Sequence, residues 1–123
     1  MDLCRPNQLD EIACDFPDLI IVAGLGGWPW VQELVAVARR HRNVFIDTSC
    51  QRPKHMAAKG SGYDPLIAYG NRGLQDQIIF ASGWGTQGIP LKQIISETED
   101  LCRNDTIRKK WMYENAARVL DID

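Results

Sequence analysis

This chain of 123 residues has no long apolar run and few histidines, and neither sign of charge is in clear excess. No apolar run approaches the roughly 20 residues that a membrane-spanning helix needs, so we expect no membrane partner. The net charge is only −2, with acidic and basic residues interspersed, and this balance argues against nucleic acid as a partner. With only two histidines, the chain has few imidazole ligands to offer a metal ion.

The four cysteines lack the spacing of a disulfide framework or a zinc site. None belongs to a Cys-x-x-Cys pair, and none lies at metal-ligand spacing from a histidine. We therefore expect reduced thiols in a cytoplasmic protein, and residues 1–6 contain no apolar core of a signal peptide. Cys14 stands among apolar residues of a predicted helix, which favours a core position. Cys50 follows a predicted strand and is the thiol that can face a site.

Three short apolar runs are present, each rich in β-branched or aromatic residues and free of proline and charge. They cover residues 19–23, 44–46 and 78–81. Runs of this kind, separated by helical periodicity, are typical of buried parallel strands joined by crossover helices. The sequence therefore predicts one α/β domain over residues 1–123, with three parallel strands, packed helices and an unpaired strand edge on both sides.

Helical periodicity and chain breakers place the remaining elements. Helices are predicted over residues 7–16, 29–41, 64–70, 91–101 and 104–120. Pro29 fits the first position of the second helix, and residues 51–62 are predicted to form a loop. The basic residues 39–42, His41 included, lie at the end of that helix, where positive charge interacts favourably with the helix dipole. The last helix is expected to bury Ile107, Trp111, Ala116, Val119 and Leu120.

Functional groups of a parallel sheet gather at the carboxyl ends of its strands. Those ends are residues 24–27, 47–50 and 82–85. The first is rich in glycine, and its backbone N–H groups, that of Gly26 among them, can either cradle a small anion or belong to a simple tight turn. A dinucleotide-binding fingerprint is excluded because Pro29 stands where its last glycine would be.

Four side chains near these ends are candidates for binding or catalysis. Asp47 can orient a substrate or a histidine, or it can bond the backbone of its own loop. His55 lies on a loop that would overhang the site, where it can touch a ligand or simply face solvent. Cys50 and His55 have the residue types of a nucleophile and its base, but the sequence identifies no third group that would orient them. Trp84 follows a strand end and suits either a pocket wall or a packing position.

Five segments resemble, in order and spacing, the amidohydrolase-related family of the amidohydrolase 2 type. They are FPDLIIV (16–22), GWPW (27–30), HRNVFIDTS (41–49), LQDQIIFAS (74–82) and ENAARVL (114–120). The resemblance implies a metal-dependent hydrolase or decarboxylase with a TIM-type (β/α)8 barrel. Under this resemblance the chain corresponds to the last three β/α units of the barrel, which contain strands six to eight.

The resemblance also implies a divalent metal such as zinc. In the family, metal-binding residues lie on the first and fifth strands, outside the matched portion. An aspartate after strand eight is a metal ligand and proton acceptor, and a histidine commonly follows strand six. The matching positions here are Leu25 and Gly83, and Gly85 stands where the family often has proline. Leucine and glycine carry no side-chain donor for a metal. We therefore expect no cofactor and no catalysis for this chain alone.

Two classes of function remain open. The first is enzymatic by descent: a metal-dependent hydrolase or carbon–carbon lyase whose activity needs strands that another polypeptide supplies or that truncation has removed. The second is a non-catalytic module that binds a small ligand or a protein partner on the same half-barrel. In both classes, unpaired strand edges favour self-association or binding to a complementary N-terminal barrel fragment.

Overall fold

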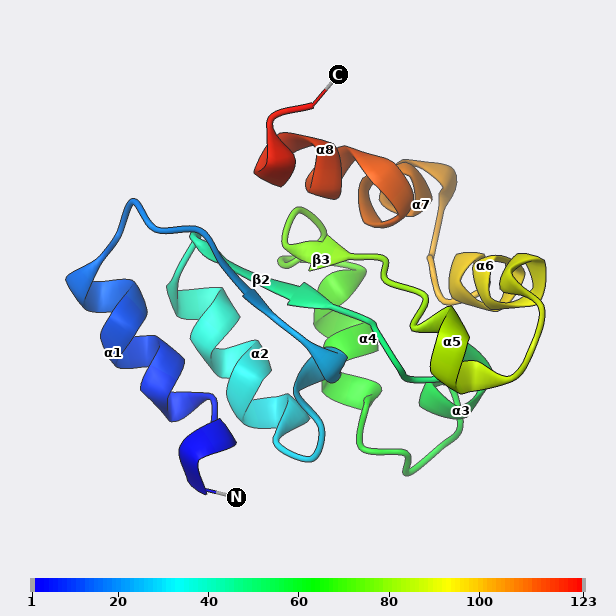
Figure 1. Cartoon of the computed structure of the whole chain (residues 1–123), viewed down its shortest axis with the longest axis horizontal. Coiled ribbons are helices and arrows are strands. Elements are labelled where there is room, and N and C mark those ends of the chain that lie inside the picture. The colour runs from blue at the N-terminus through cyan, green and yellow to red at the C-terminus, as the bar shows by residue number, and fades with distance from the viewer. Residues whose placement is uncertain (1, 123) are drawn as a thin grey trace.

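Three parallel strands form the centre of the molecule and lie side by side in chain order (Figure 1). The structure is a computed structural model that describes residues 2–122. The strands are β1 (Ile21–Ala23), β2 (Val44–Asp47) and β3 (Ile78–Ile79). The predicted α/β class and the three parallel strands are confirmed, although β1 and β3 are shorter than the apolar runs that predicted them.

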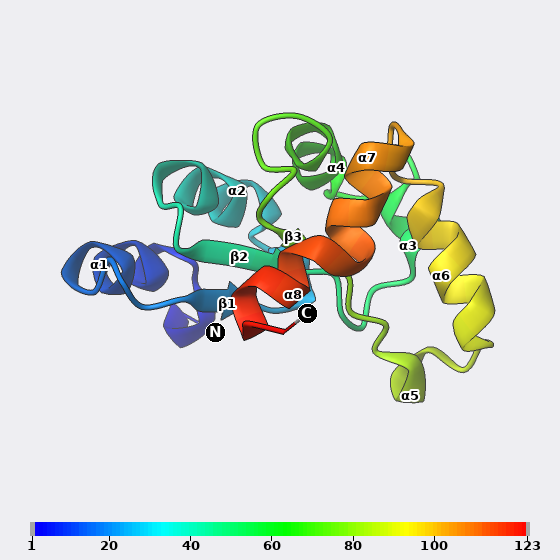
Figure 2. The ribbon, with the colours of Figure 1, turned by 90° about the horizontal axis from the view of Figure 1, so that it is seen from above.

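One face of the sheet is covered by α2 (Val31–Arg40) and α4 (Asp64–Gly70), as Figure 2 shows. The apolar stripe of α2 is buried against this face and forms the core together with Val44, Ile46 and Ile78. Helical spacing of apolar residues gives α2 a continuous side to pack on the sheet, which is why the sequence identifies this helix well.

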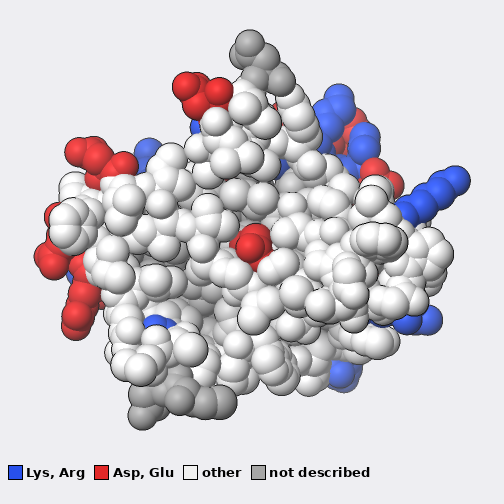
Figure 3. Space-filling view, in the orientation of Figure 1, with Lys and Arg blue, Asp and Glu red and all other residues white. Residues whose placement is uncertain are grey.

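The opposite face is open beside β1 but covered toward β3, where α8 (Asn115–Leu120) places Arg118 over the Phe45 ring, 5.9 Å from its centroid. Phe45 is therefore only 6% exposed, whereas Val22 is 46% exposed. Figures 1 and 2 show the strands and helices on this side. Because side chains alternate along a strand, the register places Val22, Phe45, Asp47 and Ile79 together on this open face. Figure 3 shows its charged groups at the periphery and one isolated acidic group near its middle. Parallel sheets are normally buried on both sides, so the exposed part of this face beside β1 is unusual.

The two edges of the sheet differ. At β3, the Phe80 N–H donates to the Trp111 carbonyl (2.8 Å) and the Asn115 side-chain amide donates to the Ile78 carbonyl (2.7 Å). The expectation of two unpaired edges is therefore wrong at β3, where the C-terminal helical segment covers the edge. β1 pairs only with β2 among the described residues.

The C-terminal segment is helical throughout, but its middle turn is wider than an α-helix. Asn104 caps it by accepting a hydrogen bond from the Ile107 N–H (2.9 Å). The π-helical turn shifts the helical phase of the residues after it, so Asn115 and Ala117 are buried, whereas Leu120 is 65% exposed. The predicted burial of Leu120 is wrong for this reason. The segment comprises α7 (Asp105–Lys109), the π-helical turn η3 (Lys110–Glu114) and α8 (Asn115–Leu120).

The structure also corrects three local predictions. The second helix begins at Val31, not at Pro29, because Trp30 has non-helical backbone angles. Cys14 is exposed, because its neighbour Ala13 occupies the buried side of their helix. The predicted loops contain two short helices, α3 (Pro53–Met56) and α5 (Trp84–Gln87).

The remaining elements are η1 (Asp2–Cys4), α1 (Asn7–Asp15), η2 (Leu25–Gly27) and α6 (Leu91–Glu99).

Within residues 2–122, every helix is too short or too polar to cross a membrane.

We expect the chain to self-associate through β1, because an uncovered strand edge pairs readily with another chain. Val22 is 46% exposed beside this edge, and a lysine there would oppose pairing. Size-exclusion chromatography with light scattering should show oligomers for the wild type and a shift toward monomer for Val22→Lys. Leu120→Lys on α8 is the matched control and should leave the oligomers unchanged. A wild-type protein that stays monomeric at every concentration would contradict this expectation.

Candidate functional site

The turn after β1 places three successive residues in the left-handed region of backbone space. Leu25, Gly26 and Gly27 have φ of 62°, 59° and 83°. Glycine adopts this conformation without steric cost, whereas leucine does not. The end of β2 holds Leu25 in place: its N–H donates to Asp47 Oδ1 (3.1 Å) and to Ser49 Oγ (3.3 Å). The candidate site therefore begins with a strained turn that Asp47 secures.

Gly26 has a packing role. It is buried, and a Cβ built on it would lie 2.8 Å from Cε1 of Tyr63. The Tyr63 hydroxyl donates to the Leu25 carbonyl (3.2 Å), and the N–H groups of Gly27 and Trp28 bond carbonyls of the same turn. Most of the donors that an anion would need are therefore engaged, which favours the tight-turn interpretation of this loop.

Asp47 lies at the carboxyl end of β2 and is partly buried. Its Oδ1 accepts hydrogen bonds from the Ser49 N–H (2.9 Å), the Ser49 hydroxyl (2.5 Å) and the Leu25 N–H. Its Oδ2 has no hydrogen-bond partner among the described residues. The predicted bond to its own loop is thus present, and it uses only one of the two carboxylate oxygens.

His55 lies on α3, not on an extended loop, and is exposed. It lines a cavity of about 340 Å³ together with Trp28 and Tyr63. The rings of Trp28 and Tyr63 are stacked with centroids 5.7 Å apart, and burial raises the pKa of Tyr63 to about 12. This aromatic cavity is wide open to solvent, because Trp28 is 51% exposed and His55 is exposed as well. Trp28 belongs to the GWPW segment and could have been singled out, whereas no signal in the sequence marked Tyr63.

Cys50 and Trp84 do not join this cavity. Cys50 is exposed and forms no hydrogen bond with His55 in the described part of the chain, so the structure does not assemble the nucleophile and base that their residue types suggested. Trp84 is 59% exposed on α5 and lines a separate shallow hollow. The sequence therefore placed both near the mouth of the sheet, but the structure does not bring them to His55.

Gly83 is packed against the backbone of Cys50. Its φ is 53°, and that of Cys50 is 58°. A Cβ at position 83 would collide with the backbone nitrogen of Cys50 and lie 2.7 Å from its Cα. Contacts this close to backbone cannot be relieved by a side-chain rotation. Position 83 therefore has no room for a side chain while this loop keeps its conformation.

An ion pair joins Arg52, the residue before α3, to Glu97 of α6. Arg52 Nη2 donates to Glu97 Oε1 (2.8 Å), Arg52 Nε donates to Oε2 (3.1 Å), and the Lys54 N–H also donates to Oε2 (3.3 Å). The hydrogen bond from Arg52 is the main reason why the pKa of Glu97 falls from 4.5 to about 2. This two-pronged geometry suits a planar guanidinium, and the sequence did not reveal the pair.

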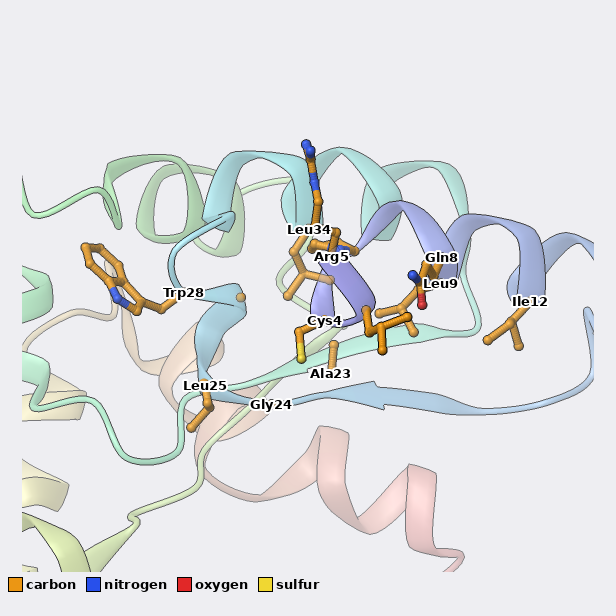
Figure 4. A pocket seen from close by; sticks show the side chains of 13 residues that line it. Cys4, Arg5, Gln8, Leu9, Ile12, Ala23, Gly24, Leu25, Trp28 and Leu34 are labelled. Atoms are coloured by element: carbon orange, nitrogen blue, oxygen red, sulfur yellow. The ribbon is translucent and has the colours of Figure 1, made fainter. Parts of the chain in front are cut away.

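A second hollow, of about 340 Å³, lies between α1, α2 and β1. Figure 4 shows the side chains of Leu9, Ala23 and Leu34 converging in it, whereas Leu25 and Trp28 point away. The hollow is apolar and opens beside the edge of β1 that no described strand pairs with. Its lining resembles an incompletely covered core more than a site with convergent polar groups.

Removal of the Asp47 carboxylate should destabilise the fold. Asp47→Ala loses three hydrogen bonds to a charged acceptor and frees the strained turn at Leu25, so we expect a loss of about 2 kcal/mol or more in the free energy of unfolding. Asp47→Asn keeps one oxygen acceptor and should lose less. Urea unfolding measures both, with the exposed Asp18→Ala as control. Equal stability of wild type and Asp47→Ala would contradict the assigned role.

Acid should weaken the Arg52–Glu97 pair. The pKa of Glu97 is lower in the folded state than in the unfolded state, so its stabilisation is complete above about pH 5 and is lost as the pH falls toward about 2. Wild-type stability should therefore fall more steeply over this range than that of Glu97→Gln. Thermal unfolding at a series of pH values tests this, with Glu114→Gln as the control. Parallel profiles for wild type and Glu97→Gln would show that the pair contributes nothing.

Comparison with known proteins identifies the family. The amidohydrolase family model matches residues 1–122, and no curated protein matches the chain. An uncharacterized TIM-barrel protein from Bordetella bronchiseptica has a similar structure, with a TM-score of 0.79 and 29% sequence identity. The match covers 94% of this chain but only 39% of the Bordetella protein. The chain described here belongs to the amidohydrolase family.

Proposed function

We propose that this chain is the carboxyl-terminal part of an amidohydrolase-type barrel, equivalent to its last three β/α units, and that its own residues do not carry out metal-dependent hydrolysis or decarboxylation. The activity of such a barrel would need further strands, from another polypeptide or from the rest of a longer chain. The observation that carries the proposal is the close packing of Gly83 against Cys50 at a position where the family resemblance implies a metal-binding aspartate.

The donor set at the mouth of the sheet does not fit a catalytic metal. Leu25 stands where the resemblance implies histidine, its side chain has no donor atom, and its N–H is already bonded to Asp47. Position 83 has neither a side chain nor the space for one. A catalytic zinc needs about three protein ligands with nitrogen, oxygen or sulfur donors. The two family positions that fall within this chain therefore contribute none.

The open face of the sheet supports the need for further strands. Val22 is 46% exposed on this face, and the apolar hollow, lined by Ala23 and Leu34, adjoins the same strand on the side that α2 covers. In a closed barrel, side chains of opposing strands fill the space above such a face. The Bordetella protein is more than twice as long as the portion that this chain matches, which leaves length for those strands.

Asp47 and the aromatic cavity are what this chain would add to an assembled site. Asp47 Oδ2 is available at the carboxyl end of the sheet, where barrel enzymes bind their substrates. Trp28 and Tyr63 supply a stacked, mostly apolar wall, and His55 adds a polar group at its rim. The role of the chain in the complete barrel is to position and enclose a small organic substrate.

A non-catalytic binding module is the second candidate. All the residues that line the aromatic cavity, Trp28, Tyr63 and His55 among them, belong to the described part of this chain. Such a cavity can bind a small aromatic or apolar ligand without any chemistry. Quenching of tryptophan fluorescence by a ligand that also loses affinity in Trp28→Ala, while the protein shows no turnover, would favour this function over the enzymatic one.

The proposal is tested by restoring the two missing donors. The double variant Leu25→His and Gly83→Asp should show no turnover of ester, amide or carboxylic-acid substrates with added zinc or manganese. Gly83→Asp should also lower the free energy of unfolding by roughly 1–3 kcal/mol, because the new Cβ meets the Cys50 backbone. Gly85→Asp is the matched control, since a Cβ there meets nothing within 4 Å. Turnover by the wild type or the double variant alone would overturn the proposal.

A further inference from the structure

Three potential metal ligands of different chemical types meet between α1 and the end of α2. Asp10 and Cys14 lie one helical turn apart on α1, and His41 follows the last residue of α2. His41 Nε2 is 2.6 Å from Asp10 Oδ1 and 4.0 Å from Cys14 Sγ. All three donor atoms lie within 4.8 Å of one another. The sequence does not reveal this arrangement, because His41 lies 27 residues after Cys14.

Helix packing explains why these groups meet. α1 lies against α2 (Figure 1), and residues four apart on a helix share one face, so Asp10 and Cys14 both point toward the end of α2. The His41 N–H ends α2 by donating to the Val37 carbonyl (3.0 Å). Its side chain is only 10% exposed, which fixes the imidazole against α1, while Cys14 remains open to solvent.

We propose that Asp10, Cys14 and His41 form a binding site for Zn²⁺ or a similar cation. Carboxylate oxygen, thiolate sulfur and imidazole nitrogen are the three donor types that zinc uses in proteins. Zinc with bonds of roughly 2.0–2.3 Å in tetrahedral geometry holds its ligand atoms roughly 3.3–3.6 Å apart. Shifts of less than about 1 Å would bring these three donors to that spacing, and the exposed side leaves a fourth position for water.

The same geometry argues against a nucleophilic triad. In a triad, the base uses one ring nitrogen for the nucleophile and the other for the orienting carboxylate. Here Asp10 and Cys14 approach the same atom, Nε2 of His41. The thiol and the carboxylate therefore compete for one position, which is the arrangement that a shared cation resolves.

The site lies at the opposite end of the sheet from the candidate functional site. His41 precedes β2 by a short turn, whereas Asp47 ends it. A cation held there would link α1 to the turn between α2 and β2, so its effect would be on stability and not on substrate. This proposed cation site does not depend on the side-chain donors that are missing at positions 25 and 83.

Arg40 sets the affinity of this site. Its Nη1 donates to Asp10 Oδ2 (3.0 Å), whereas Asp10 Oδ1 is the oxygen that contacts His41. The guanidinium nevertheless repels a cation at close range. Replacement of Arg40 by glutamine should therefore tighten binding, which is the opposite of what loss of a simple surface ion pair would produce.

Cobalt(II) is the probe that tests the proposal on the whole, reduced chain. A thiolate bound to cobalt gives a ligand-to-metal charge-transfer absorption band, so titration should produce this band, saturate at about one ion per chain and reverse on addition of zinc. Cys14→Ser should abolish the band. Asp10→Asn and His41→Gln should weaken binding by more than the roughly 10–100-fold that loss of an outer-shell partner causes.

Cys4→Ser is the matched control, because Cys4 is also exposed but lies outside the cluster, and it should keep the band. Zinc should raise the unfolding temperature of wild type and Cys4→Ser, but not of Cys14→Ser. Circular dichroism checks that each variant is folded. Absence of the band in folded wild type, or an unchanged band in Cys14→Ser, would overturn the proposal and leave an ordinary Asp10–His41 ion pair.

Discussion

Burial of a parallel sheet on both faces is the constraint on which the rest of this structure depends. The chain satisfies it on one side, where α2 and α4 cover Val44, Ile46 and Ile78. On the other side, Arg118 of α8 lies over Phe45, which is only 6% exposed, but Val22 beside β1 is 46% exposed. A closed barrel meets the same constraint with side chains from opposing strands. The exposed part of the sheet and the apolar hollow beside β1 therefore support the proposed need for further strands.

The segment that comes after β2 joins the ends of all three strands. Asp47 bonds the turn after β1 through Leu25, and the Thr48 hydroxyl accepts a hydrogen bond from the Ala81 N–H (3.3 Å), just beyond β3. The local and functional interpretations of Asp47 are thus compatible, because one carboxylate oxygen organises the loops and the other is left for a ligand. Ser49 strengthens the arrangement by bonding the same oxygen as Leu25.

The sequence predicted the parts of the fold that short-range patterns determine. The β-branched runs identified the strands, and the apolar stripe of residues 31–38 identified α2. It did not predict the burial of Asn115, because a π-helical turn shifts the helical phase without an obvious sequence signal. Contacts between distant segments were also hidden: Arg52 meets Glu97, and Cys14 meets His41 across 27 residues, only because separate helices pack together.

The contact between Gly83 and Cys50 limits which residues can replace glycine at position 83. The loops that contain Gly83 and Cys50 pack against each other, and both residues have left-handed backbone angles. The backbone of Cys50 fills the space that a side chain at position 83 would need. A single substitution cannot restore a carboxylate there, because the loop of residues 47–50 must first follow another path. A carboxylate gained in that way would still stand alone, because Leu25 offers a metal ion no side-chain donor.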